Sequence, residues 1–406
     1  MSLKKTIYVF TSSFPCDEHG EIYLWDELAY LANAFDAVYF LPQKGKLPIK
    51  DLPNNCFVIP EPIIQKEDLS VSTYFQIIKW VLSDFKVLFK KKLLRKLLIY
   101  NYSLLKQLIV KANYYSSIIK NTRSEKNYLY AYWFSDYATI AALIKKELPQ
   151  AIAISRAHGF DVFENQTEYG FIPFRKLQFK YIDSVLSVSK AGAHHLKKNN
   201  QSYEKKISSS YLGTLNHTNH LNSISDKFQI ASCSIIRDIK RLHLMVDILK
   251  HIEIPITWHV IGNGPDFESL KRLVTTLPNH VEVIFYGLLS KDQINNFYLT
   301  HEINLFISLS SSEGLPVSMM EAQSYGIPIM STDVGGSNEI CKDQTGFLIV
   351  PNFDVRDVSD KIKDFSYSYK NTNEFHQKCR QHWEMNFNAE LNYKEFMMLI
   401  DNLDHS

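Results

Sequence analysis

The stretch SLSSSEGLPVSMMEAQSYGIPIMST, residues 308–332, decides the fold. The apolar run 303–309 has the length of a buried strand, and a serine-rich polar loop follows it. We expect a helix to begin near Pro316, because proline suits a first helical turn, and to end around Gly326. The apolar run 327–330 then predicts the next strand. This order of strand, loop, helix and strand is typical of a parallel α/β sheet.

Two glutamates in this stretch are candidates for ligand binding. Glu313 follows the predicted strand, at the edge of the sheet where α/β proteins bind ligands. The free N–H groups at the start of the predicted helix favour an anion such as a diphosphate. Glu321, in the second helical turn, is placed to reach another part of the same ligand. We interpret the two carboxylates as holding two ends of one molecule, against the alternative of a loop acid and a solvated helix residue.

Length and composition limit the class of protein. The chain has 406 residues, of which 45% are apolar and 13% aromatic, so we expect a globular protein of two domains. Its net charge of +2 gives no general case for nucleic-acid binding. The five cysteines lack CxxC spacing, which predicts reduced thiols and neither a disulfide framework nor a zinc site. No apolar run has the length of a signal sequence core or a membrane span, so we expect a cytoplasmic protein.

Strand and helix patterns alternate in two halves. In the first half we expect strands at 6–10, 37–41, 128–134, 151–157 and 184–188, and helices at 23–35 and 139–146. The stretch 208–226, rich in serine, asparagine and histidine, is the best candidate for a domain boundary. In the second half, before the stretch quoted above, we expect strands at 228–236, 256–261 and 281–286, and helices at 242–251, 266–276 and 292–298. The expected architecture is two β-α-β domains that face one another across a cleft.

The segment SSSEGLPVSMMEAQSYGIPIMSTDVGGSNEI, with TGFLI after it, resembles the nucleotide-sugar site of retaining glycosyltransferases of the GT-B fold, specifically glycosyltransferase family 4. Shorter matches agree in order along the chain: a TSSFP…GE loop after the first strand, RAHGFD at 156–161, SVSKA at 187–191, IKR at 239–241 and IGNGP at 261–265. The resemblance implies an α/β protein with two Rossmann-like, doubly wound domains. It implies an acceptor-side domain at 1–212, a nucleotide-sugar domain at 213–382, and a C-terminal helix at 383–406 that crosses back.

The resemblance also implies roles for individual residues. Glu313 matches the glutamate that contacts hydroxyls of the donor sugar, and Glu321 the one that binds the ribose. Lys240 matches the lysine on the diphosphate, and His158 a histidine near the reacting sugar. Gly20 matches a glycine that lets the backbone approach the phosphates. The further donor-binding residues expected on this basis are Arg237, Arg241, Gly262, Gly314, Leu315, Pro316 and Val317.

One position departs from the family pattern. Family members commonly carry an arginine five residues before the lysine, as a second phosphate ligand, and this chain has Ile235 there. Arg237 and Arg241 are the two candidates to replace it. His158 has an alternative role as a core histidine bonded to backbone, and Lys240 as a surface lysine at a helix start. For Asp161 and Glu164 the sequence leaves open whether they touch an acceptor or cap a helix.

The region 74–126 is basic and helix-like, without proline or glycine and with only Asp84 and Glu125 as acids. Together with Trp80, Phe85, Phe89 and Tyr100, this composition is typical of a helical surface on an anionic membrane. The resemblance suggests a reason, because many relatives extend lipid-linked sugars at the inner face of the cytoplasmic membrane. The alternative is a helical insertion, at about 70–126, that packs on the first domain and keeps its basic face in solvent. No recognised nucleic-acid module accompanies the basic run, so we expect no nucleic-acid partner.

The expectation is therefore a retaining, metal-independent glycosyltransferase without a cofactor. Its substrates would be a UDP- or GDP-linked sugar and a glycan or polyprenyl-linked acceptor. It would act in the assembly of capsule, O-antigen or exopolysaccharide. Three rival functions are a phosphorylase-like enzyme with pyridoxal phosphate, a nucleotide-sugar 2-epimerase, and a catalytically silent nucleotide-binding subunit. The sequence does not identify the sugar, the base, the linkage or the oligomeric state.

Overall fold

The computed structural model describes residues 3–17, 20–62, 71–83, 94–167, 170–216, 227–368 and 373–404. The chain forms two compact units, one made of Met1–Ser210 with Tyr393–Ser406 and the other of Tyr211–Asn392. The sequence placed the first division after residue 212 and the return crossing after residue 382.

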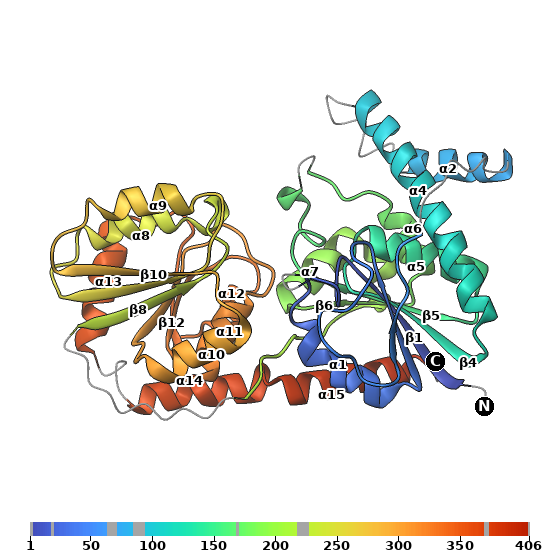
Figure 1. The fold of residues 1–406 in the computed structure, drawn as a ribbon. Coiled ribbons are helices and arrows are strands. Elements are labelled where there is room, and N and C mark those ends of the chain that lie inside the picture. Colours follow the sequence, from blue (N-terminus) through green and yellow to red (C-terminus); the bar gives the residue numbers. More distant parts are fainter. Residues whose placement is uncertain are drawn as a thin grey trace. The chain divides into compact units, whose positions relative to one another are not determined.

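The first unit is built on a parallel sheet whose described strands follow the order β3-β2-β1-β4-β5-β6-β7 (Figure 1). The strands are β1 (Leu3–Thr11), β2 (Ala37–Pro42), β3 (Cys56–Val58), β4 (Ser124–Ala131), β5 (Ile152–Ala157), β6 (Ser184–Ser187) and β7 (Ile207–Ser209). The short edge strands β3 and β7 were not expected from the sequence. The central strands are buried almost throughout and carry continuous apolar runs, as parallel sheets covered on both faces do.

Helices cover both faces of this sheet. They are α1 (Leu24–Ala34), α2 (Val71–Ser83), α4 (Leu94–Asn121), α5 (Asp136–Glu147), α6 (Arg175–Tyr181), α7 (Lys190–Asn199) and the end of α15 (Ala389–Asn402). One core cluster joins the sheet to α2, α4 and α5, and a second joins it to α1 and α15. In the second cluster the α15 side chains of Phe396 and Ile400 are buried, so this last helix completes the core of the first unit.

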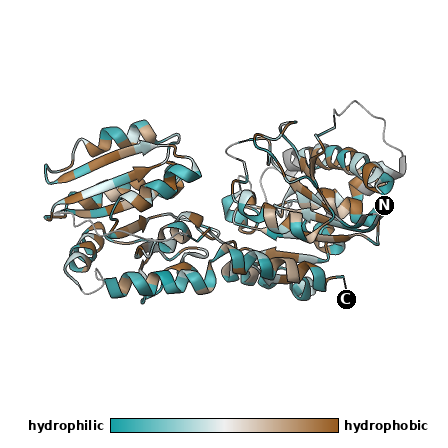
Figure 2. Cartoon of the chain, turned by 60° about the horizontal axis from the view of Figure 1, so that its bottom comes forward, coloured by the Kyte–Doolittle hydropathy of each residue, from teal (hydrophilic) through white to brown (hydrophobic). Residues whose placement is uncertain are grey.

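The second unit is built on a parallel sheet whose described strands follow the order β10-β9-β8-β11-β12-β13. The strands are β8 (Phe228–Cys233), β9 (Ile256–Ile261), β10 (Val281–Gly287), β11 (Leu305–Ser308), β12 (Ile329–Thr332) and β13 (Gly346–Ile349). The helices are α8 (Leu242–Leu249), α9 (Phe267–Val274), α10 (Lys291–Thr300), α11 (Val317–Ser324), α12 (Ser337–Ile340), α13 (Val355–Tyr367) and α14 (Asn373–Asn386). Figure 2 shows the sheets as mostly hydrophobic layers and the helices with mixed faces.

Several strands end earlier than their apolar runs suggested. The run 128–134 leaves the sheet after Ala131, because the Phe134 N–H donates to the Asp161 carboxylate at 2.8 Å and not to a neighbouring strand. The run 228–236 leaves it after Cys233 and bonds to the turn that follows β9. Pro316, expected in the first turn of α11, is the residue just before that helix.

The basic insertion contains two described helices, α2 and α4, and residues 84–93, with Asp84, Phe85 and Phe89, lie outside the described part. The apolar side of α4 packs into the core through Leu105, Leu108 and Tyr115. Figure 1 shows α2 next to α4, and Ile77 and Val81 of α2 belong to the same core cluster. Among the described residues no helix is long and apolar enough to span a membrane.

Candidate active site

The sheet of the second unit has its topological switch point at β8. The chain runs outward from β8 through β9 to β10, then returns to place β11 on the other side of β8. The segments that follow β8 and β11 therefore leave the same edge of the sheet in opposite directions and open a crevice, where α/β proteins bind ligands. Lys240 lies in the first segment and Glu313 in the second, so the topology brings them together.

Lys240 and Glu313 form an ion pair in this crevice. The Lys240 Nζ lies 2.5 Å from the Glu313 Oε1, although the residues are 73 positions apart. The Ser310 hydroxyl donates to the same carboxylate oxygen, also at 2.5 Å. The two charged side chains are 20% and 11% exposed, which leaves each partly accessible to a ligand. A cation and a carboxylate with some access to solvent are the groups that a diphosphate and a sugar hydroxyl require.

Two glycines hold the loop of Glu313 against the segment after β12. Gly335 has φ of +55°, and a Cβ atom there would lie 1.8 Å from the Glu313 carbonyl oxygen. The Gly336 N–H donates to the Gly314 carbonyl at 2.7 Å. Glu339, the last residue of this Gly-Gly-x-x-Glu motif, accepts a hydrogen bond of 2.6 Å from the Tyr211 hydroxyl. The motif thus shapes the Glu313 loop through backbone contacts.

Glu321 lies on α11, which starts beside this loop. Its carboxylate is close enough to Cys233, at the end of β8, and to Tyr325 that its charge helps to raise the pKa of both groups, after burial, which is the larger cause. The helix buries Met319 and Met320 completely, whereas Glu321 is partly exposed. Glu321 therefore stands on the accessible side of α11. Of the other predicted residues on this loop, Leu315 and Pro316 are buried, and Gly314 and Val317 are partly exposed.

The two arginines considered as replacements at Ile235 are placed differently. The guanidinium of Arg241 donates to the carbonyls of Leu309, Ser310 and Pro351, at 2.6, 3.3 and 2.8 Å, so it braces the Glu313 loop from behind. Arg237 is exposed and lines a pocket of about 260 Å³ whose other walls include Asp238 and Asp266 but neither Lys240 nor Glu313. Ile235 itself is 59% exposed. The Arg241 guanidinium is thus engaged by backbone carbonyls, whereas Arg237 lies at an exposed pocket.

Gly262 serves a tight backbone contact. Its φ is +129°, and a Cβ atom there would lie 1.9 Å from the Ser234 carbonyl oxygen. Its N–H donates to the Gly287 carbonyl at 2.7 Å. The turn after β9 thereby packs against the segment that leads from β8 to Lys240, and this packing accounts for the glycine.

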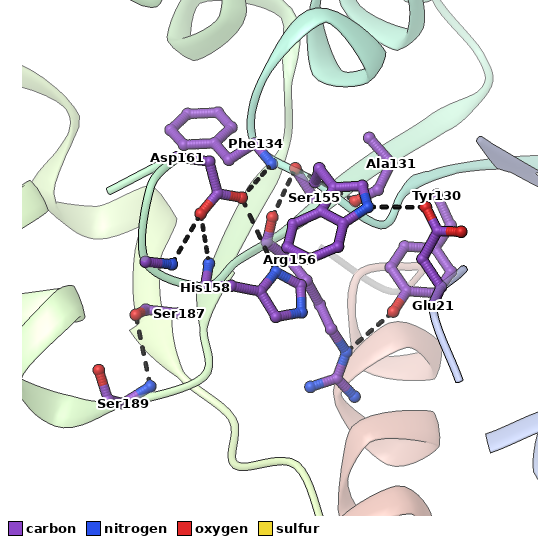
Figure 3. A network of polar contacts seen from close by, with 12 residues as sticks. Glu21, Tyr130, Ala131, Phe134, Ser155, Arg156, His158, Asp161, Ser187 and Ser189 are labelled. Carbon is purple, nitrogen blue, oxygen red and sulfur yellow. Dashed lines mark hydrogen bonds and ion pairs between the residues drawn. The ribbon is translucent and has the colours of Figure 1, made fainter. Parts of the chain in front are cut away.

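In the first unit, His158 follows β5 and lies beside Asp161 (Figure 3). The Asp161 carboxylate is fully buried and accepts the backbone N–H groups of His158, Gly159 and Phe134. Burial alone would raise the pKa of Asp161, but the His158 ring and these N–H groups together lower it. Asp161 therefore shapes the loop and is not accessible to an acceptor.

The His158 ring is not used as a core hydrogen-bonding group. Its Nδ1 lies 3.7 Å from the Asp161 Oδ2, which is too long for a hydrogen bond, and both ring nitrogens lack a hydrogen-bond partner among the described residues. The ring packs on Trp133 and Tyr132, with centroid distances of 4.3 and 4.8 Å. The His158 side chain is 13% exposed, and a mostly buried imidazole without hydrogen bonds favours a functional role over a purely structural one.

Glu21, next to the predicted Gly20, was not singled out from the sequence. A Cβ atom at Gly20 would lie 1.8 Å from the Ser13 hydroxyl, so glycine lets the loop after β1 fold back on itself. The fold-back places the Glu21 carboxylate over the start of the same loop, where it accepts the Ser13 and Phe14 N–H groups at 3.1 and 3.0 Å. The quoted TSSFP…GE pattern contains the glutamate, but its partners become visible only in the folded loop.

Comparison with known proteins places this geometry in a family. Residues 214–382 match the family described as Glycosyl transferases group 1. An O-antigen biosynthesis glycosyltransferase, WbnH of Escherichia coli, is 38% identical over 114 residues, which cover 28% of this chain and 31% of that protein. The chain thus matches about a third of the length of this curated relative.

Solved structures resemble the whole described chain. The lipopolysaccharide outer core galactosyltransferase WaaB superimposes with a TM-score of 0.67 at 16% identity and covers 98% of this chain and 99% of its own. HepE of Anabaena, in complex with UDP and glucose, superimposes with a TM-score of 0.64 at 13% identity and covers 98% and 100%. The two parallel sheets have the GT-B architecture expected from the sequence. The chain therefore has the GT-B fold, and its residues 214–382 match the family described as Glycosyl transferases group 1.

Proposed function

We propose that this protein is a retaining glycosyltransferase that moves a sugar from a nucleotide diphosphate onto a glycan or lipid-linked glycan in surface polysaccharide assembly. The observation that carries the proposal is the Lys240–Glu313 ion pair, which lies at the switch point of a group 1 domain. The two side chains are 20% and 11% exposed, so a ligand can reach both charges.

The donor is assigned to residues around that pair. Lys240 takes the diphosphate, Glu313 the hydroxyls of the sugar, and Glu321 the ribose. The first two lie 2.5 Å apart, and a bound donor would replace that contact with one partner for each. The backbone of Gly314 and the start of α11 stand next to the diphosphate, where unpaired N–H groups favour negative charge. UDP and GDP are the candidate nucleotides.

The proposed chemistry is a front-face displacement. The bond between the anomeric carbon and the diphosphate oxygen breaks, the acceptor hydroxyl oxygen bonds to that carbon on the same face, and the hydroxyl proton passes to the departing diphosphate. Lys240 stabilises the charge that develops on the leaving group, as a fixed cation does without reorganisation. This gives the reaction its proposed independence of metal. His158, whose ring nitrogens make no hydrogen bond to the described residues, is assigned to the reacting sugar.

The acceptor side is proposed to meet an anionic membrane from the cytoplasmic face. The apolar side chains of α2 support this proposal, because Phe75, Ile78 and Leu82 are 70%, 46% and 52% exposed on one described helix. Ile77 and Val81 of the same helix are buried, so α2 is apolar on both sides. Exposed apolar side chains near basic ones are typical of a surface that inserts between anionic headgroups.

A thermal-shift screen against UDP, GDP, ADP and their common sugar conjugates tests the donor assignment. A ligand that binds only the folded state raises the melting temperature by mass action. We expect one nucleotide class to stabilise the wild type and to lose its effect in Glu321→Ala. The control is Glu253→Ala, because that carboxylate is 84% exposed and lies on the surface of the same unit. A flat response to every nucleotide, or equal stabilisation of Glu321→Ala, contradicts the assignment.

A further inference from the structure

The first unit has a topological switch point of its own. Its chain runs from β1 through β2 to β3, then returns to place β4 on the other side of β1. The segments after β1 and β4 therefore diverge at one edge of the sheet, as those after β8 and β11 do in the second unit. The segment after β1 carries Glu21, the one after β4 carries Trp133, and the neighbouring one after β5 carries Phe160.

Glu21 fixes the two diverging segments to each other. Its carboxylate accepts the backbone N–H groups of Ser12, Ser13 and Phe14 and, at 2.8 Å, the indole N–H of Trp133. Glu21 is 8% exposed, and its backbone φ of +26° lies outside the range that residues other than glycine prefer. A carboxylate with four N–H donors is a strong brace, so the orientation of the Trp133 ring is set before any ligand arrives.

Trp133 and Phe160 form an aromatic surface at this switch point. Their ring centroids are 5.1 Å apart and their planes are tilted by 40°, and the indole also contacts the rings of His158 at 4.3 Å and Tyr132 at 5.3 Å. Phe160 is 46% exposed, although it lies three residues after the end of the buried strand β5. Packing within the unit therefore does not account for a large aromatic side chain at this position.

We propose that Trp133 and Phe160 form a stacking platform for a pyranose ring of the acceptor glycan. The apolar face of a pyranose carries C–H groups that pack on the electron-rich face of an aromatic ring, which leaves the hydroxyls free at the rim. A charged pair follows in the same segment: Glu164, four residues after Phe160, lies 2.8 Å from the His195 imidazole. An apolar floor with a few polar groups at its edge is the usual composition of a small-ligand site.

This assignment rests on the proposed glycosyl transfer, but its test uses no nucleotide and measures no transfer. The chain has five tryptophans, so protein labelled with 5-fluorotryptophan gives five fluorine resonances, and the Trp133→Phe spectrum identifies the one from Trp133. The probes are methyl glycosides of a hexose, a 6-deoxyhexose and an N-acetylhexosamine. We expect at least one of them to shift the Trp133 resonance in a saturable way, with Trp258 and Trp383 of the second unit unaffected.

Two phenylalanine variants make the test specific. Phe160→Ala weakens the apparent affinity about tenfold, the size expected for one lost stacking contact, and Phe160→Tyr keeps it. Phe57→Ala is the matched control, because Phe57 is 44% exposed and lies on β3 of the same unit. The proposal is overturned if no glycoside moves the Trp133 resonance or if Phe160→Ala binds like the wild type. It is also overturned if decanol, an apolar alcohol without a sugar ring, reproduces the shift. A failed nucleotide screen with a shifted Trp133 resonance would instead count against the proposed function alone.

Discussion

Lys240 and Glu313 neutralise each other across the end of the β8–β11 pair, with Nζ 2.5 Å from Oε1. The carboxylate also accepts the Ser310 hydroxyl, so a ligand that separates the pair leaves Glu313 with one hydrogen bond in place. The ion pair thus holds two opposite charges in a partly buried crevice without an uncompensated charge.

Removal of one member of this pair is expected to cost more than removal of both. Lys240→Met leaves the Glu313 carboxylate without its cation, and we expect a loss of about 1–2 kcal/mol in the free energy of unfolding. Lys240→Met/Glu313→Gln removes the unpaired charge and should recover most of that loss. Urea unfolding of the wild type, both single variants and the double variant measures the coupling. A double variant whose loss equals the sum of the single losses would show that the pair does not interact.

Gly335→Ala tests the support of the Glu313 loop. The new methyl group would meet the Glu313 carbonyl oxygen, so we expect lower stability and weaker nucleotide binding. Gly287→Ala is the control, because Gly287 also has a positive φ, +69°, but has nothing within 4 Å of an added Cβ. In the control, only the backbone strain of alanine at a positive φ should lower the free energy of unfolding, by about 1–2 kcal/mol. Equal stability and equal nucleotide affinity in the two variants would contradict a role for Gly335 in shaping the loop.

Stability is expected to fall in mild acid because of His259. Burial, with a smaller contribution from His301, lowers the pKa of His259 from 6.5 to about 4. Between those values the unfolded chain binds more protons than the folded one, so the free energy of unfolding rises with pH. The contribution of His259 to the free energy of unfolding is fully present above pH 6.5 and is lost as the pH falls towards 4. The loss amounts to at most about 3 kcal/mol.

Urea unfolding between pH 4 and 7.5 measures this dependence, and His259→Gln should flatten part of the slope. Burial also lowers the pKa of His376 to about 4, so His376 contributes to the same pH dependence. The rest of the slope should therefore remain in His259→Gln. An imidazole of His259 that titrates near pH 6.5 in NMR spectra of the folded protein would exclude this explanation.

Arg156 is expected to hold the core of the first unit together. It is fully buried, with its Nε donating to the Tyr130 hydroxyl at 2.8 Å and its guanidinium 3.5 Å from the Glu27 carboxylate and 3.8 Å from the Phe396 ring centre. Arg156→Met leaves the buried Glu27 without a cation and should cost about 3–5 kcal/mol. Arg156→Met/Glu27→Gln should cost less, as thermal unfolding of both variants would show. A double variant less stable than Arg156→Met would refute the charge argument.

The exposed side of α2 is expected to bind vesicles. Phe75→Ser/Ile78→Ser/Leu82→Ser should reduce cosedimentation with vesicles that contain phosphatidylglycerol, because it removes the apolar side chains that would enter the headgroup layer. Leu288→Ser is the control, since Leu288 is 58% exposed and belongs to the second unit. Equal binding of the triple variant and the wild type would remove α2 from the proposed membrane surface.

The sequence predicted most of the fold because its buried strands carry strong local patterns. β9 was predicted with its observed limits, Ile256–Ile261, and the strand, helix and strand around α11 were placed within a few residues. The edge strands β3 and β7 have three residues each and no periodicity of their own, so their neighbours in the sheet decide them. The early end of β4 depends on a hydrogen bond from Phe134 to Asp161, which no local pattern reveals.

The residues of the candidate site also divide into those that local motifs predict and those that only the fold brings together. Glu313, Glu321 and Lys240 were predicted as site residues because they belong to motifs with fixed spacing, and their roles stay predictions. Glu21 and Trp133 are 112 residues apart and meet only because β1 and β4 are neighbours. The role of Arg241 also needed the fold, since its hydrogen bonds go to backbone carbonyls that are at least 68 residues away.

The central claim is sugar transfer from a nucleotide diphosphate at the Lys240–Glu313 site. The most direct test incubates the protein with the nucleotide sugar that stabilises it, carrying a ¹³C-labelled sugar, and a lipid-linked glycan fraction, and follows the anomeric carbon by NMR. We expect the label to move to a new glycosidic carbon with the anomeric configuration of the donor, and Lys240→Met/Glu313→Gln to abolish the transfer while it remains folded. A label that stays on the nucleotide, either unchanged or as an epimer, would contradict the claim and identify a silent binding subunit or an epimerase.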